Sequence, residues 1–259
     1  GNKFEIRMVG SSMNCAAPMT IMNSIVGHQL AEFKAEVDKL MDEGMSRDTA
    51  ILSILKRYID ESQSVLFEGD GYSEEWKEEA ASRGLSNTPN TPDALGAYLD
   101  ERSKALFEKS GVFTERELEA HYEVMCENYI LKVQIESRTM GEIVINHVLP
   151  AAINYQTKVL DNISAMKSIG MDEKYYATQL DIVKRISDNV YAINEAVAKM
   201  TEARRKANAL EDATEKTRAY CYDVIPFMQT IRLHADRLEY LVDDREWPLV
   251  KYRELMFVR

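Results

Sequence analysis

Three long stretches in the second half of the sequence carry apolar residues at three- and four-residue spacing, the period of a helix that is buried on one face. The first opens with the capping box Thr-Glu-Arg-Glu at residues 114–117. The second covers residues 172–205 and alternates steps of three and four, as coiled coils do. The third covers residues 211–242. Long helices joined by short loops pack as antiparallel neighbours, so the sequence predicts a helical bundle with Val190 and Ile193 in its seam.

The remaining periodic stretches predict shorter helices in the first half. One runs over residues 18–44 and another from Ser46, which has a capping hydroxyl, to about Leu66. The apolar face of the first, which we expect to be buried, is formed by Ile21, Met22, Ile25, Val26, Leu30, Phe33, Val37, Leu40 and Met41. Pro150 is expected to kink or break the first long helix, because proline has no backbone N–H to donate, and Pro226 falls inside the last one.

Charge and cysteine content limit the class of protein. A net charge of −11 over 259 residues argues against nucleic acid or an anionic membrane as a partner. Cys15, Cys126 and Cys221 are an odd number without a Cys-x-x-Cys pair, so they are interpreted as reduced thiols of a cytoplasmic protein rather than a disulfide frame or zinc site. The most apolar run, residues 143–153, is shorter than the ~20 residues that a membrane-spanning helix requires.

The glutamate-rich bundle raises the question of a di-iron centre, which requires a glutamate three residues before a histidine on two helices. The residues at that position before the four histidines are Ile25, Leu118, Val144 and Ile231. None is acidic, so a di-iron centre is excluded. We expect the histidines to be surface or hydrogen-bonded core residues, and Cys126 and Cys221 to be packing residues.

The first twelve residues read Gly-Asn-Lys-Phe-Glu-Ile-Arg-Met-Val-Gly-Ser-Ser and alternate apolar with charged side chains. This period of two predicts a strand, with Phe4, Ile6 and Met8 on one face. Glu5 and Arg7 then point the same way, roughly 6–7 Å apart. A carboxylate beside a guanidinium suits a metal-bound phosphate, the carboxylate holding the cation and the guanidinium the anion. An edge strand with solvated charges explains the alternation equally well.

These twelve residues resemble the last active-site strand of glutamine synthetase, in the form carried by the long type III enzymes. The common short enzymes have an aromatic residue and Pro-Asp after the arginine, where this chain has Met8-Val9-Gly10. The loops at residues 69–76 and 87–92 and the tail at residues 247–257 also resemble type III enzymes. The resemblance implies that Glu5 is a ligand of an active-site Mg²⁺ or Mn²⁺. It implies that Arg7 is catalytic and contacts the transferred phosphate and the substrate.

The resemblance also implies an activity and partners. Glutamine synthetases use ATP to convert glutamate to γ-glutamyl phosphate, from which ammonia displaces phosphate. Type III enzymes form homo-oligomers of two stacked hexameric rings. The chain has no initiator Met and begins inside the motif, so we expect it to be a piece of a longer protein. The ATP, glutamate and remaining metal sites would then lie upstream, and this piece alone would be inactive.

The predicted fold class is mainly α, with the N-terminal strand and a helical bundle forming the C-terminal part of a larger α+β fold. Residues 1–45 are expected to end the catalytic domain, residues 46–112 to form a helical connection, and residues 113–259 to form the long-helix bundle and tail. The alternative is a non-enzymatic helical scaffold or oligomerisation module in which the strand has no catalytic role.

Overall fold

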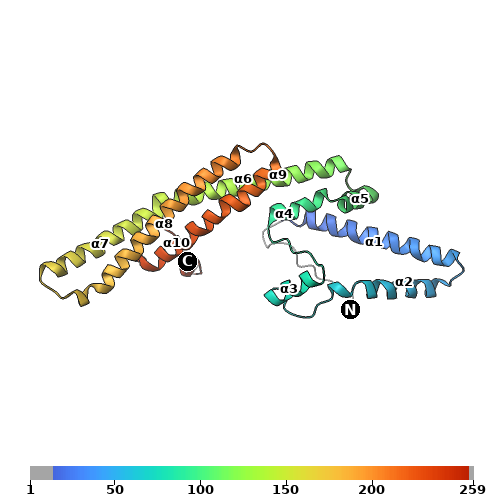
Figure 1. The fold of residues 1–259 in the computed structure, drawn as a ribbon, viewed down its shortest axis with the longest axis horizontal. Coiled ribbons are helices and arrows are strands. Elements are labelled where there is room, and N and C mark those ends of the chain that lie inside the picture. Colours follow the sequence, from blue (N-terminus) through green and yellow to red (C-terminus); the bar gives the residue numbers. More distant parts are fainter. Residues whose placement is uncertain (1–13, 257–259) are drawn as a thin grey trace. The chain divides into compact units, whose positions relative to one another are not determined.

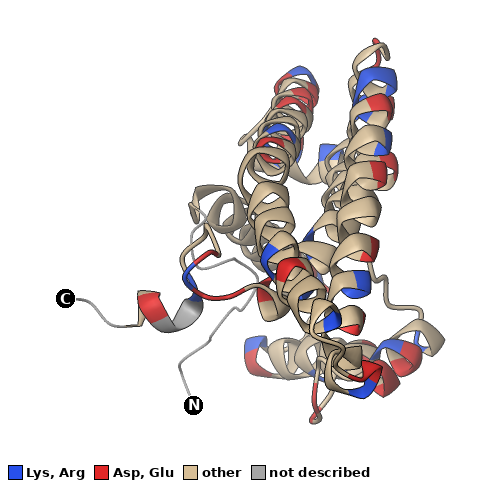
Figure 2. Ribbon diagram, turned by 90° about the vertical axis from the view of Figure 1, so that its left-hand side faces the viewer, with Lys and Arg blue, Asp and Glu red and all other residues tan. Residues whose placement is uncertain are grey.

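The computed structural model describes residues 14–256, and the strand predicted at residues 1–12 lies outside this range. Between residues 14 and 256 every regular element is a helix, which confirms the mainly α class (Figure 1). The chain divides into two compact units, Gly1–Tyr122 and Glu123–Arg259. Positively and negatively charged residues are interspersed along the helices (Figure 2), so exposed ion pairs at one-turn spacing are frequent and individually weak.

The first unit begins with a helical hairpin of α1 (Ala16–Asp42) and α2 (Arg47–Glu61). Gly44, with a φ of 97°, makes the turn between them, and the Ser46 hydroxyl accepts a hydrogen bond from the Thr49 amide to cap α2. A small core joins the two helices. It consists of Val37, Ala50 and Ile54, with Phe33, Leu40, Ile51 and Tyr58 packed around them.

Short helices complete the first unit. They are η1 (Gln63–Val65), α3 (Glu74–Ser82), α4 (Thr91–Leu95), η2 (Gly96–Leu99) and α5 (Glu101–Ser110), of which α5 packs against α1. The loop before α3 is held by an aromatic stack, in which the Phe67 and Trp76 rings lie 3.9 Å apart. Arg83 covers Trp76 and donates to the carbonyl oxygens of Ser64 and Leu66, so this loop is tied back to the end of α2.

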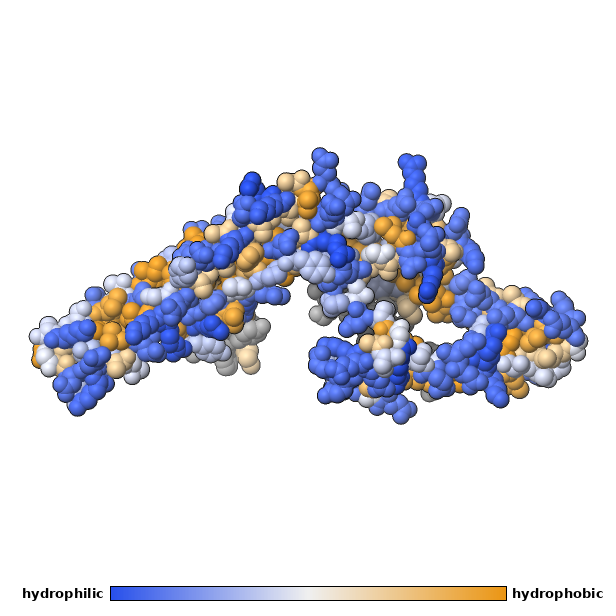
Figure 3. Space-filling view, viewed as in Figure 1, coloured by the Kyte–Doolittle hydropathy of each residue, from blue (hydrophilic) through white to orange (hydrophobic). Residues whose placement is uncertain are grey.

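The predicted burial of the α1 apolar face is wrong for much of its length. Ile25, Val26 and Leu30 are 44%, 50% and 62% exposed, and on α2 Leu52 is 67% exposed. Although α2 and α5 both pack against α1, these apolar residues remain at the surface. Apolar residues are visible on the surface in Figure 3. The second predicted helix also ends earlier than expected, at Glu61.

The second unit is the predicted bundle of long helices. Its first rod comprises α6 (Glu115–Ile143), which contains the boundary between the units, the π-helix η3 (Val144–Val148) and α7 (Leu149–Ser168). After η4 (Glu173–Tyr175), α8 (Ala177–Asn208) returns antiparallel to it. The third rod comprises α9 (Ala213–Ala219), the π-helix η5 (Tyr220–Val224) and α10 (Ile225–Leu241), and α11 (Tyr252–Leu255) follows in the tail.

The core of this unit lies between α8 and its neighbours α7 and α10, which pack along it. Ile193 is fully buried and Val190 is partly buried against the same core, which confirms the predicted seam. The core residues with no exposed surface are Val148, Ala152, Ile186, Ile193, Tyr220, Val224, Ile231 and Leu238.

Pro150 and Pro226 are accommodated without breaking their rods. Each proline is the second residue of an α-helix that directly follows a π-helical turn. A proline in a regular helix collides with the carbonyl of the residue four positions earlier, and that residue, Asn146 or Tyr222, lies inside the π turn in both cases. The wider turn therefore relieves the collision, and the expected break at Pro150 is replaced by a change of helix type.

Because Ile193 is enclosed by the bundle core, truncation to alanine should leave a cavity. We expect Ile193→Ala to lower the free energy of unfolding by about 2–4 kcal/mol in urea titrations. Tyr191→Ala on the same helix removes a side chain that is 69% exposed. It should change the free energy of unfolding by less than about 0.5 kcal/mol. Equal effects of the two changes would contradict the seam.

Two glycines should respond in opposite directions to alanine. At Gly141, inside α6, an added Cβ would lie 3.5 Å from Met200 Cε, an ordinary contact, so Gly141→Ala should raise the free energy of unfolding by up to about 1 kcal/mol. Gly111 has a φ of 66°, where an L-residue is strained, so Gly111→Ala should lower it by about 1 kcal/mol. Thermal melts of both variants measure the difference, and a loss of stability at Gly141 would contradict the packing described.

Candidate functional site

The two residues that the sequence singles out for chemistry, Glu5 and Arg7, lie outside the described residues, and their roles stay predictions. Within residues 14–256, no group of three or more His, Cys, Asp or Glu side chains is arranged to hold a metal ion. Within the same range, no helix combines the length and the apolar character needed to cross a bilayer. The remaining candidates are two clefts and a few buried polar contacts.

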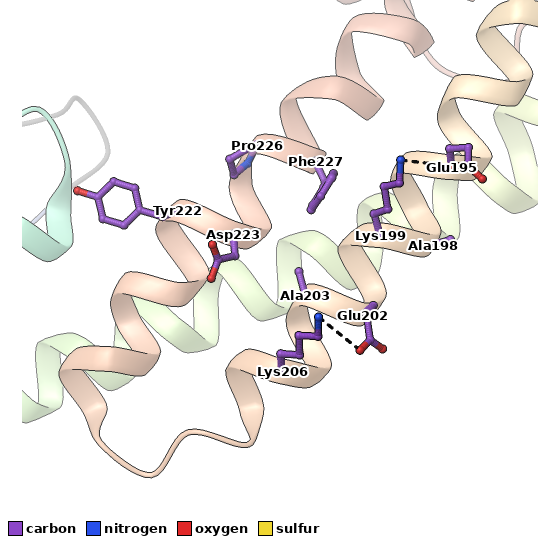
Figure 4. Close-up of a pocket in the computed structure, with 10 residues that line it drawn as sticks. All are labelled: Glu195, Ala198, Lys199, Glu202, Ala203, Lys206, Tyr222, Asp223, Pro226 and Phe227. Atoms are coloured by element: carbon purple, nitrogen blue, oxygen red, sulfur yellow. Dashed lines mark ion pairs between the residues drawn. The ribbon is translucent and has the colours of Figure 1, made fainter.

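A cleft of 820 Å³ opens between α8 and the η5–α10 rod (Figure 4). The α8 side carries Lys199 and Lys206, which pair with Glu195 and Glu202 on the same helix at 3.3 and 4.0 Å. The opposite side is formed by Tyr222, Asp223, Pro226 and Phe227. Since each lysine is already neutralised by its own helix, the cleft has the character of an ordinary solvated surface rather than of a catalytic centre.

An apolar groove of 740 Å³ runs between α6–η3 and α10 and is bordered by the tail. The buried ring of Trp247 forms part of its wall. Lys251 holds the tail in place, because its ammonium pairs with Asp244 and donates to the Glu239 carbonyl oxygen at 3.3 Å. On the other side of Trp247, Glu246 pairs with Lys158 of α7 at 2.8 Å. The tail is thus non-helical around Pro248, as predicted. Ion pairs of Glu246 and Lys251 hold it on both sides of this segment.

The four histidines and two of the cysteines behave as the sequence predicts. His28 lies 3.1 Å from Glu32 on the α1 surface, and His121 is exposed with its ring centroid 4.7 Å from that of Phe113. Cys126 is buried. Cys221 is half-buried beside the Tyr129 hydroxyl, and burial together with this contact raises the pKa of Tyr129. None of these groups forms a nucleophile–base pair.

A buried polar contact links α8 to α10. His234 Nδ1 lies 2.7 Å from Asn189 Oδ1, and the Asn189 amide donates to the Arg185 carbonyl oxygen at 2.7 Å. Because the Asn189 amide nitrogen is committed to that carbonyl, its oxygen must accept, so His234 donates through Nδ1. Burial, reinforced by the nearby positive charge of Arg237, lowers the pKa of His234. The contact is structural, because the described residues place no nucleophile beside it.

A second polar contact, between α6 and α8, was not visible in the sequence. Gln134 Nε2 donates to Asn208 Oδ1 at 3.4 Å, and the Tyr220 hydroxyl donates to the same oxygen at 2.7 Å. Arg138 and Arg204 lie one turn from Gln134 and Asn208, respectively. Each arginine looks like an ordinary surface residue in its own helix, and only the pairing of α6 with α8 shows that the two lie opposite one another.

Comparison with known proteins places this helical fold in a class. Residues 50–167, which span α2 to α7, match the family model of the glutamine synthetase C-terminal domain. The class of protein that this region resembles is therefore that of a glutamine synthetase C-terminal domain.

The relatives make the resemblance more particular. The chain is 49% identical over 262 residues to a glutamine synthetase of Bacteroides fragilis (strain YCH46), and 33% identical over 266 residues to a type-3 glutamine synthetase of Dictyostelium discoideum. A glutamine synthetase of Butyrivibrio fibrisolvens is 30% identical over 262 residues. The matches cover 100%, 100% and 99% of this chain but 36% of each relative. They confirm the resemblance to the C-terminal portion of a type III glutamine synthetase, and the chain spans about a third of the length of these relatives.

The lowered pKa of His234 predicts a pH effect on stability. The unfolded chain binds a proton near pH 6.5, whereas folded His234 resists it, so the neutral side chain contributes stability above that pH. This contribution is lost as the pH falls from about 6.5 toward the lower pKa of the folded state. His234→Gln should therefore lose less stability than the wild type between about pH 7.5 and pH 5.5 in urea titrations. His147→Gln, the same change at an exposed position of η3, is the matched control.

Proposed function

We propose that this chain is part of a glutamate–ammonia ligase, a glutamine synthetase of type III. The observation that carries the proposal is the 49% identity to the Bacteroides fragilis glutamine synthetase over the whole chain. The aligned region includes the first twelve residues, whose Glu-Ile-Arg pattern predicts a strand with charged side chains on one face.

In the proposed reaction the side-chain carboxylate of glutamate attacks the terminal phosphate of ATP and forms γ-glutamyl phosphate. Ammonia then displaces phosphate and leaves glutamine. A bound divalent cation offsets the charge of the phosphates during such a transfer. From this chain, the Glu5 carboxylate would ligate Mg²⁺ or Mn²⁺, and the Arg7 guanidinium would hold the transferred phosphate with two parallel hydrogen bonds.

The proposed site requires more than this chain. An oxygen-ligand cation site needs several ligands at fixed positions, and Glu5 supplies one. The ATP pocket, the glutamate site and the other ligands are therefore assigned to residues outside this chain, in the part of the relatives that it does not match. The proposal also includes a cytoplasmic homo-oligomer, whose contacts would cover exposed apolar residues such as Val26 and Leu30.

Glu5 and Arg7 can be tested in the intact protein by measuring glutamine formation against metal concentration. Glu5→Gln removes a charged ligand, so the rate should fall at least about 10- to 100-fold and more metal should be needed. Arg7→Lys should also fail, because an ammonium cannot reproduce the two-pronged contact with phosphate. Melting temperatures should stay close to that of the wild type, since the sequence pattern assigns neither side chain to the apolar face of the predicted strand.

Matched controls are Glu43→Gln and Arg47→Lys, which make the same chemical changes at exposed positions directly after α1 and at the start of α2. Both should keep normal rates. If Glu5→Gln retains a normal rate and normal metal demand, the site assignment is wrong. If Phe4→Ala unfolds the protein while both charge changes are silent, the strand is structural only.

A further inference from the structure

Antiparallel pairing of α6 and α8 brings two arginines opposite one another. Gln134 on α6 reaches Asn208 on α8, and further along the pair Gly141 lies beside Met200. Moving one turn forward from Gln134 and one turn back from Asn208 leads to Arg138 and Arg204. Residues one turn apart on a helix share a face, so both arginines occupy the facing sides of their helices between these two contacts.

No carboxylate balances this pair of charges. Among the hydrogen bonds and ion pairs of residues 14–256, none involves the side chain of Arg138 or Arg204. Glu142, one turn after Arg138, makes no ion pair with it, and Glu202 is engaged by Arg205 at 2.8 Å and Lys206 at 4.0 Å. The two facing arginines therefore have no acidic partner among residues 14–256.

The electrostatics agree with the geometry. Partial burial, followed by the proximity of Arg138, lowers the pKa of Arg204. Burial raises the pKa of the Tyr220 hydroxyl, and the positive charges of Arg204 and Arg138 lower it part of the way back. The two guanidinium groups therefore lie near this hydroxyl and near one another, with Arg138 exposed and Arg204 partly buried. A bound anion would offset the repulsion between the two like charges.

A neighbouring amide is held in a fixed position at the same place. The ring of Tyr220 is fully buried, and its hydroxyl donates to Asn208 Oδ1 at 2.7 Å. Gln134 donates to the same oxygen, so the Asn208 carboxamide oxygen is fully used while its amide group makes no hydrogen bond to any other residue between 14 and 256. The region thus combines two cationic forks with an uncharged donor, and among residues 14–256 no carboxylate pairs with the two arginines.

We propose that Arg138, Arg204 and Asn208 form a binding site for a phosphate-type oxyanion between α6 and α8. A phosphate dianion balances both charges and has enough acceptor atoms for two guanidinium groups and an amide, whereas a carboxylate balances one charge. The ligand is inorganic phosphate or the terminal phosphate of a nucleotide. The proposal uses only residues of the second unit and does not rest on the proposed ligase activity.

The test is equilibrium dialysis of the intact protein with radiolabelled phosphate at constant ionic strength. Arg138→Gln and Arg204→Gln should each weaken one phosphate site by about ten- to a hundredfold, since a hydrogen bond to a charged group is lost. Arg205→Gln is the matched control. It removes the same charge from the next residue of α8, where Arg205 pairs with Glu202, and it should leave phosphate binding unchanged.

Competition identifies the source of the phosphate. If ADP displaces phosphate from the wild type, but does not displace the phosphate still bound by Arg204→Gln, the site binds a nucleotide. If sulfate displaces phosphate and ADP does not, the site binds the free anion. Phosphate should also raise the melting temperature of the wild type above the value in potassium chloride of equal ionic strength. Without phosphate, Arg204→Gln should melt no lower than the wild type, because repulsion is relieved. Identical phosphate binding in Arg204→Gln and Arg205→Gln, or displacement by glutamate alone, overturns the proposal.

Discussion

Burial of the apolar side chains of α8 is the interaction on which the second unit depends. Ile186, Ile193 and Met200 lie two turns apart on α8, and each is enclosed by the rods on either side. Because α7 and α10 both pack along this helix, its burial positions the α6–α7 rod and the α9–α10 rod together. The tail, the His234 contact and the two facing arginines depend on that arrangement.

The sequence predicted the helices well because each long rod shows its own period. Ile193 could be assigned to the seam from spacing alone, whereas the exposure of Val26 on α1 could not, since an apolar stripe does not reveal what covers it. The π turn before Pro150 was also missed, because proline shows where a helix is strained but not how the strain is relieved.

The candidate sites differ in what made them visible. Glu5 and Arg7 were predicted from a short local pattern and from resemblance, and the described residues do not include them. Arg138 and Arg204 are far apart in sequence, and their meeting depends on the register between α6 and α8, which no local period specifies. Sequence reasoning can therefore propose local chemistry, whereas chemistry shared between distant helices requires the fold.

The two π turns have a consequence for the direction in which each rod presents its side chains. A π turn takes in one more residue than an α turn, and one residue corresponds to about 100° of rotation around a helix axis. The apolar stripe of the rod is therefore re-aimed at η3, where α6 gives way to α7. One continuous rod can in this way border the groove beside α10 with its first part and pack on α8 with its second. Removing a single residue from either turn would misalign every contact beyond it.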